Sequence, residues 1–147
     1  MAGKKRIAAK LDLPTRDEIL HKINSINKEN SADPLRDKAL ISITYLTGAR
    51  ISEIINRIKP LDIEEKKYKE YKIWIIHNVK TLKQRNARKD MNRNIPIVVN
   101  KEIEFTHHVV RYMSKVPPEE PLFKMTRQWA WKIVLRHTGW YNHFFRH

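Results

Sequence analysis

The sequence contains no cysteine and only three glycines in 147 residues. The absence of cysteine excludes a disulfide scaffold, a thiolate zinc site and a cysteine nucleophile. No glycine-rich phosphate-binding loop is present, and no cluster of His, Asp and Glu has the spacing of metal ligands. No apolar run approaches the roughly 18 residues that span a membrane, and the first ten residues contain no apolar signal core. These absences predict a soluble, cytoplasmic domain with no membrane partner, no metal and no cofactor.

Acidic residues are also scarce. Thirty Lys and Arg against sixteen Asp and Glu give a formal net charge of +14 at pH 7. Residues 66–93 hold ten of the basic residues and two of the acidic ones, so more than half of the excess lies in 28 residues. The hydrophobic fraction of 41% is ordinary for a folded domain. A folded domain with this charge typically binds a polyanion, most often nucleic acid.

Capping signals predict helices in the first part of the chain, behind a basic flexible leader at residues 1–13. Thr15 and Glu18 have the spacing of a capping box, and an apolar stripe follows. Asp33 before Pro34 predicts the start of a second helix, and Gly48 its end. A third, short helix is expected over about 51–58, before Pro60.

The hydrophobic period then changes to that of strands. Strands are expected at 61–63, 71–76 and 94–99, with Trp74 and Ile76 on one face of the second strand. Pro96 favours an edge position for the third strand. Between the last two strands, residues 83–94 contain almost no large apolar residue, which favours an extended basic arm or hairpin.

Helices are predicted again over 100–115 and 126–139. Inward-facing residues are expected to be Ile103, Val110 and Met113 in the first of these helices, and Trp129, Ile133 and Val134 in the second. The predicted fold class is therefore α+β and mostly α-helical, with helices around a small three-stranded antiparallel sheet that carries a basic β-hairpin arm.

The segment from Tyr45 to Ile55 is the most distinctive in the chain. Arg50 stands just after the predicted helix end at Gly48 and at the entrance to the next helix, where backbone amides favour an anion. Arginine offers a planar, permanently charged fork that suits a phosphate. Glu53 is expected on the same helix face, within reach of the Arg50 guanidinium. From the residues alone, a glycine-capped turn with a solvated Arg–Glu pair is the favoured interpretation.

Three segments carry a resemblance to a known family. The first is Thr47-Gly-Ala-Arg-Ile-Ser-Glu-Ile-Ile55, the second is residues 79–85 followed by 94–97, and the third is His143-Phe-Phe-Arg-His147. In this order they resemble the first active-site box, the lysine-bearing β-hairpin and the second active-site box of the tyrosine recombinases, the phage integrase family. The resemblance runs from about Pro14 to the last residue, so residues 14–147 are interpreted as a tyrosine recombinase catalytic-like domain.

The resemblance implies a catalytic role for four residues. Arg50 and Arg146 would bind the scissile phosphate and stabilise charge on its non-bridging oxygens. Lys80 would protonate the leaving 5′ oxygen as a general acid, with Lys83 as the alternative in the same turn. His143 would hydrogen-bond the phosphate or transfer a proton. The supporting residues would be Glu53 and His147.

A second segment resembles the end of the second box. Leu135-Arg-His-Thr138 contains an Arg-His pair, but Ile133 stands three residues before Arg136, where the family has histidine. The box is therefore assigned to His143 and Arg146. The remaining histidines have no such context, and a place at the surface or the edge of the core is expected for His77, His107 and His108.

In this family the nucleophilic tyrosine lies well downstream of the second box. None of the five tyrosines of the printed sequence has that position, so no nucleophile is assigned among Tyr45, Tyr68, Tyr71, Tyr112 and Tyr141. We therefore expect a catalytic domain that is incomplete at its C-terminus and that does not cleave DNA by itself.

The function implied by the resemblance is site-specific recombination or integration. The partner would be double-stranded DNA, joined through a 3′-phosphotyrosyl intermediate in the full-length protein, with further copies of the chain assembled on the DNA. Basic residues in and beside the arm are expected to contact the DNA backbone: Lys83, Arg85, Arg88, Lys89 and Arg93. The alternative is a non-catalytic DNA-binding module or a regulatory remnant of an integrase, because the charge supports both equally.

Overall fold

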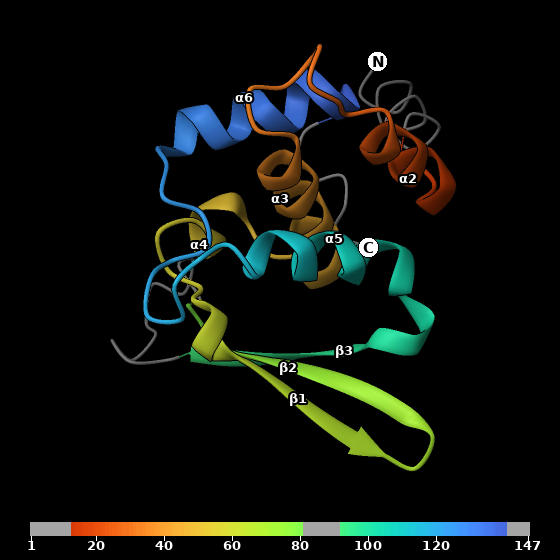
Figure 1. Cartoon of the computed structure of the whole chain (residues 1–147), viewed down its shortest axis with the longest axis vertical. Coiled ribbons are helices and arrows are strands. Elements are labelled where there is room, and N and C mark those ends of the chain that lie inside the picture. The colour runs from red at the N-terminus through yellow and green to blue at the C-terminus, as the bar shows by residue number, and fades with distance from the viewer. Residues whose placement is uncertain (1–12, 81–91, 141–147) are drawn as a thin grey trace, which may run out of the picture.

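The computed structural model describes residues 13–80 and 92–140. In chain order these residues form α2 (Arg16–Asn24), α3 (Pro34–Thr47), α4 (Ile51–Ile54), β1 (Ile63–Tyr68), β2 (Tyr71–Lys80), β3 (Asn92–Val98), α5 (Ile103–Met113) and α6 (Arg127–Thr138). Two short 3₁₀ turns, η1 (Pro60–Asp62) and η2 (Val99–Lys101), flank the sheet. The helices gather on one side of the molecule and the sheet lies along the other (Figure 1). The predicted α+β fold class is confirmed.

Polar caps set the helix boundaries. At the start of α2 the Thr15 hydroxyl accepts the Glu18 amide at 3.1 Å, and the Glu18 carboxylate accepts the Thr15 amide at 3.2 Å. At the start of α3 the Asp33 carboxylate accepts the Arg36 amide at 3.2 Å. Gly48 (φ 62°) and Gly139 (φ 81°) end α3 and α6 in the left-handed conformation that glycine adopts without steric cost. These predicted boundaries are confirmed.

The sheet is antiparallel with the strand order β1-β2-β3. Trp74 and Ile76 of β2 are buried, while Ile73 and Ile75 on the other face are half-buried, as the alternation predicted. Pro96 lies in β3, an edge strand, where its missing N–H leaves no central ladder bond unmade.

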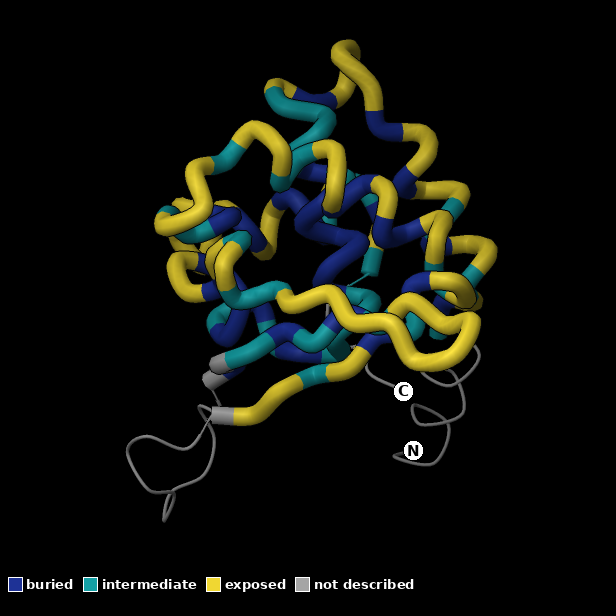
Figure 2. The backbone as a smooth tube through the Cα atoms, turned by 60° about the horizontal axis from the view of Figure 1, so that its bottom comes forward, coloured by how far each residue is buried: buried dark blue, intermediate teal, exposed yellow. Residues whose placement is uncertain are grey.

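Helix α3 lies at the centre of the helical part. It packs against α5, α6, α2 and β3, and a continuous run of its residues from Ala39 to Thr44 is buried. Figure 2 shows the buried residues gathered inside the helical part and exposed residues along the outer hairpin of the sheet. The core is mainly isoleucine and extends from α2 to α6.

Helix α4 is shorter than predicted. It ends at Ile54 and not near residue 58. Asn56 adopts a left-handed φ of 60°, and its side chain bonds both backbone groups of Met125, donating to the carbonyl at 2.7 Å and accepting from the amide at 3.1 Å. This long-range contact fixes a turn that local sequence signals do not reveal.

The first strand and two buried faces also differ from prediction. Residues 60–62 form η1, and β1 consists of the polar residues that follow, which carry no alternation because all but Ile63 are exposed. In α5, Phe105 and Val109 are buried, whereas Ile103 and Val110 are 54% and 45% exposed. In α6, Trp129 is 39% exposed, and the buried stripe contains the small Ala130 instead, together with the predicted Ile133 and Val134.

Candidate functional site

Arg50 is the N-cap residue of α4 and has an extended backbone (φ −76°, ψ 151°). Its backbone N–H donates to Glu53 Oε1 at 2.9 Å. Sequence analysis placed the guanidinium near Glu53, but within the described ranges, 13–80 and 92–140, no hydrogen bond or ion pair of the Arg50 side chain is found. Because α4 has one turn only, its dipole adds little, and attraction of an anion depends on the guanidinium itself.

Glu53 is the buried acceptor of this site. Its side chain is 4% exposed, although it lies only three residues beyond Arg50. The same oxygen, Oε1, also lies 3.4 Å from Arg93 Nη2 on β3. One carboxylate oxygen therefore joins the first active-site box to a strand 40 residues further along the chain.

The Arg93 contact places the end of the β2–β3 pair beside α4. In the antiparallel register, Arg93 lies opposite Val79 and Asn92 lies opposite Lys80, after an irregularity between Ile76 and Val79. Lys80, the last residue of β2, directly follows Val79, and Val79 lies opposite the Arg93 that contacts Glu53. The structure brings together the backbone of Lys80, the strand residue Arg93 and the Arg50–Glu53 turn.

Several predicted site residues lie outside the described residues. They are Lys83, Arg85, Arg88 and Lys89 of the basic arm and His143, Arg146 and His147 of the second box. The side chain of Lys80, to which the general-acid role was assigned, is also outside the described part of the structure. These assignments stay predictions.

The segment that also resembles the second box has a structural role. His137 lies in α6 with its side chain 4% exposed, and its Nε2 is 3.2 Å from Asp37 Oδ2. The Asp37 carboxylate also accepts the Ser31 hydroxyl at 2.6 Å and the Arg36 guanidinium at 3.0 Å. An ionised carboxylate only accepts, so His137 Nε2 is the donor of this bond. This buried network joins α3 to α6, and sequence analysis did not find it, because an Asp in the first turn of a helix is typically a surface residue.

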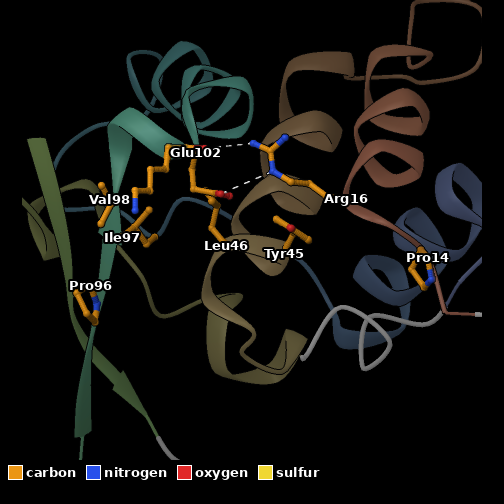
Figure 3. A pocket seen from close by; sticks show the side chains of 9 residues that line it. Pro14, Arg16, Tyr45, Leu46, Pro96, Ile97, Val98 and Glu102 are labelled. Atoms are coloured by element: carbon orange, nitrogen blue, oxygen red, sulfur yellow. Dashed lines mark hydrogen bonds and ion pairs between the residues drawn. The ribbon is translucent and has the colours of Figure 1, made fainter. Parts of the chain in front are cut away.

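A pocket of about 440 Å³ lies elsewhere, between α3, β3 and η2. Figure 3 shows Tyr45 and Leu46 on one side of it and Pro96 to Val98 on the other, with Arg16 held by Glu102. Burial and, to a smaller extent, Glu102 raise the pKa of the Tyr45 phenol, although the Arg16 charge opposes them. Among residues 13–80 and 92–140, neither Arg50 nor Lys80 lines this pocket.

Two of the four described tyrosines stack on phenylalanine rings, and the other two lie at the β1–β2 turn. Tyr45 stacks on Phe105 with ring centroids 4.4 Å apart, and Tyr112 stacks on Phe123 at 5.5 Å. Tyr68 and Tyr71 face each other at the β1–β2 turn. This turn is the opposite end of β2 from Lys80, about 30 Å away along a strand of this length.

Residues 13–80 and 92–140 contain no group of three His, Asp or Glu side chains that is able to hold a metal ion. Within the same ranges there is no helix with the length and apolar character needed to cross a membrane.

Comparison with known proteins gave one match. A search of the curated proteins and a search of the solved structures each returned no match. The family model described as the phage integrase family matches residues 15–147, which include the Arg50–Glu53 turn, the β2–β3 pair and α6. The chain therefore belongs to the phage integrase family.

Proposed function

We propose that this chain binds duplex DNA and holds one phosphate of the backbone for strand cleavage and rejoining, as the catalytic domain of a tyrosine recombinase. Membership of the phage integrase family supports site-specific recombination in general. The roles of individual residues in binding the phosphate go beyond what family membership supports and are part of this proposal.

The observation that carries the proposal is the double contact of Glu53. Through one oxygen it binds the Arg50 amide at 2.9 Å and the Arg93 guanidinium at 3.4 Å. The first active-site box and the base of the lysine-bearing hairpin are thereby neighbours, although they are separated along the chain. A site that acts on one phosphate needs cations from both segments at one place.

The proposed chemistry divides between the two segments. Arg50 would stabilise negative charge on the non-bridging oxygens as the phosphoryl group is transferred. Lys80 would give its proton to the 5′ oxygen as the bond from phosphorus to that oxygen breaks. His143 and Arg146, carried over from the resemblance, would complete the binding of the phosphate. The attacking phenolic oxygen would come from a tyrosine other than the four described.

The basic arm would supply non-specific affinity. Lys83, Arg85, Arg88 and Lys89 are proposed to neutralise phosphates along the duplex and to release counterions, so binding weakens as salt rises. Removing all four charges should weaken binding to every duplex sequence alike. An unchanged dissociation constant at moderate salt would contradict this role.

Arg50→Ala tests the proposal, with Arg111→Ala as a matched control. Arg111 is an exposed arginine near the end of α5, so both variants lose the same charge. The dissociation constant for a duplex is measured over a range of salt concentrations. Arg50→Ala should weaken binding and reduce the slope of log K against log salt by about 1, whereas Arg111→Ala should leave both unchanged.

The same experiment separates the proposal from a non-catalytic DNA-binding module. A module that uses only its basic arm would bind duplex with full salt dependence and would not need Arg50. Equal behaviour of the Arg50→Ala and Arg111→Ala variants would therefore favour the module and contradict the phosphate site.

A further inference from the structure

Arg93, one of the basic residues assigned to DNA, makes an ion pair with Glu53 of the protein itself. Its guanidinium lies 3.4 Å from Glu53 Oε1, and its side chain is 44% exposed while that of Glu53 is 4% exposed. The contact is therefore an ion pair with one partner buried and one at the surface. A buried carboxylate is costly without compensating charge and hydrogen bonds, so the Glu53 side chain favours a cation at this position.

The strand register places this ion pair next to the Lys80 end of β2. Arg93 lies opposite Val79, and the next position of β2 is Lys80. The sheet is irregular between Ile76 and Val79, so regular ladder hydrogen bonds are interrupted just before this end of the strand. A contact from β3 to α4 is then well placed to fix the end of β2 against the rest of the molecule.

We propose that Arg93 is a positioning residue, which acts through Glu53 to hold the Lys80 end of β2 at a fixed place relative to Arg50. The inference rests on the proposed function, because it explains how two segments would meet at one phosphate. Phosphoryl transfer depends on placement of the cations, and a misplacement of about 1 Å costs on the order of 100-fold in rate. Arg93 itself does not touch the phosphate in this account.

A double-mutant cycle of four proteins separates positioning from direct contact with DNA. The proteins are the unchanged chain, Arg93→Gln, Glu53→Gln and the double variant. The Glu53→Gln side chain keeps an oxygen for the Arg50 amide and loses the charge that attracts Arg93. For each protein, duplex affinity and its salt slope are measured, and thermal unfolding checks that the variant is folded.

If Arg93 acts through Glu53, each single variant should weaken duplex binding roughly threefold to tenfold, and the double variant should resemble the singles. Arg93→Lys should restore most of the affinity, since it keeps a cation for Glu53. Two results would overturn the inference. One is a Arg93→Gln variant with unchanged affinity, and the other is a fall in salt slope of about 1 on adding Arg93→Gln to Glu53→Gln, which indicates a direct phosphate contact.

Hydrogen exchange tests the link without DNA. Arg93→Gln should speed amide exchange at the Lys80 end of β2 several-fold and leave the Tyr71 end unchanged, because the lost contact is local. Unchanged exchange at the Lys80 end would overturn the inference by itself. If Arg50→Ala does not alter duplex binding while exchange changes as expected, the proposed function has failed and the strand-to-helix link has not.

Discussion

Glu53 and His108 are both buried titratable residues, and their hydrogen bonding differs. The Glu53 carboxylate accepts the Arg50 amide and pairs with Arg93. His108 is 3% exposed, its Nε2 lies 3.3 Å from Asn24 Oδ1, and its Nδ1 has no hydrogen-bond partner among the described residues. For each residue, substitution of its side chain tests a prediction about the stability of the fold.

Glu53→Ala should lower the free energy of unfolding by about 2–3 kcal/mol, because it leaves the Arg50 amide and Arg93 without their acceptor. Glu53→Gln keeps an acceptor oxygen and should cost about 1 kcal/mol. Urea unfolding measures both. Glu119→Ala, at an exposed acidic residue, is the control and should cost less than about 0.5 kcal/mol. An equal cost for Glu53→Ala and the control would contradict the role given to the buried carboxylate.

His108 should make the fold less stable in acid. Burial, followed by the charges of His107, Lys38 and Arg111, lowers the pKa of His108 from 6.5 to about 4. Between these values the unfolded chain binds the proton that the folded chain does not, so stability falls as pH drops from about 6.5 and the loss levels off near 4. The complete loss is about 3 kcal/mol.

Unfolding of a His108→Gln variant at pH 7.5 and 4.5 tests this effect. The variant should show a smaller difference in unfolding free energy between the two pH values than the unchanged chain. His21→Gln, at an exposed histidine of α2, should show the full difference. If the His108→Gln variant loses as much unfolding free energy between pH 7.5 and 4.5 as the unchanged chain, groups other than His108 cause the loss.

Among the elements, the turn after α4 depends most on contacts from far along the chain. Asn56 holds a φ of 60° and bonds Met125 through its side chain. Asn56→Ala should cost about 2–3 kcal/mol, because alanine is strained at positive φ and both side-chain bonds are lost. Asn56→Gly loses the bonds without the strain and should cost about 1 kcal/mol less. Equal costs in urea unfolding would show that backbone strain does not matter here.

The elements also show what was predictable. Thr15, Asp33, Gly48 and Gly139 carry local capping signals, and the helix boundaries that they predict are confirmed. The polar strand β1 has no apolar alternation, so its pairing with β2 has no local signal. The prediction of which residues of α5 face inward was wrong. Phe105 is buried and stacks on Tyr45, and this tertiary contact sets the rotation of the helix.

The candidate site, like the helices and strands, was predictable from the sequence only in part. The Thr47-to-Ile55 motif indicated Arg50 and Glu53 as neighbours, and the structure shows them in contact through the Arg50 amide. The Arg93–Glu53 pair required the register of β3 against β2, which no local pattern supplies. His108 was expected at the surface or the core edge and is buried, because α5 turns that side toward Asn24.

For the whole molecule, the positions of the four described tyrosines predict that none of them forms a covalent adduct with DNA. The phenols of Tyr45 and Tyr112 are packed against aromatic rings, and Tyr68 and Tyr71 lie at the far end of β2 from Lys80. An in-line attack needs a phenolic oxygen at the phosphate that the cations hold.

A duplex with a nick near the cleaved position traps such an adduct, which is seen on a denaturing gel. We expect duplex binding, with no adduct that depends on any of the four described tyrosines. An adduct that is lost on Tyr→Phe substitution at one of the four described positions would contradict the placement of the site. An adduct that is lost on Tyr141→Phe would show that the chain carries its own nucleophile.

The most direct test of the account is the structure of the chain bound to duplex DNA. The distances to measure run from the Arg50 guanidinium and Lys80 Nζ to the nearest phosphate oxygens. We predict that both groups lie within hydrogen-bonding distance of the same phosphate, with Glu53 still bound to the Arg50 amide. Arg50 and Lys80 on different phosphates, or an Arg50 side chain that points into solvent away from the duplex, would contradict it.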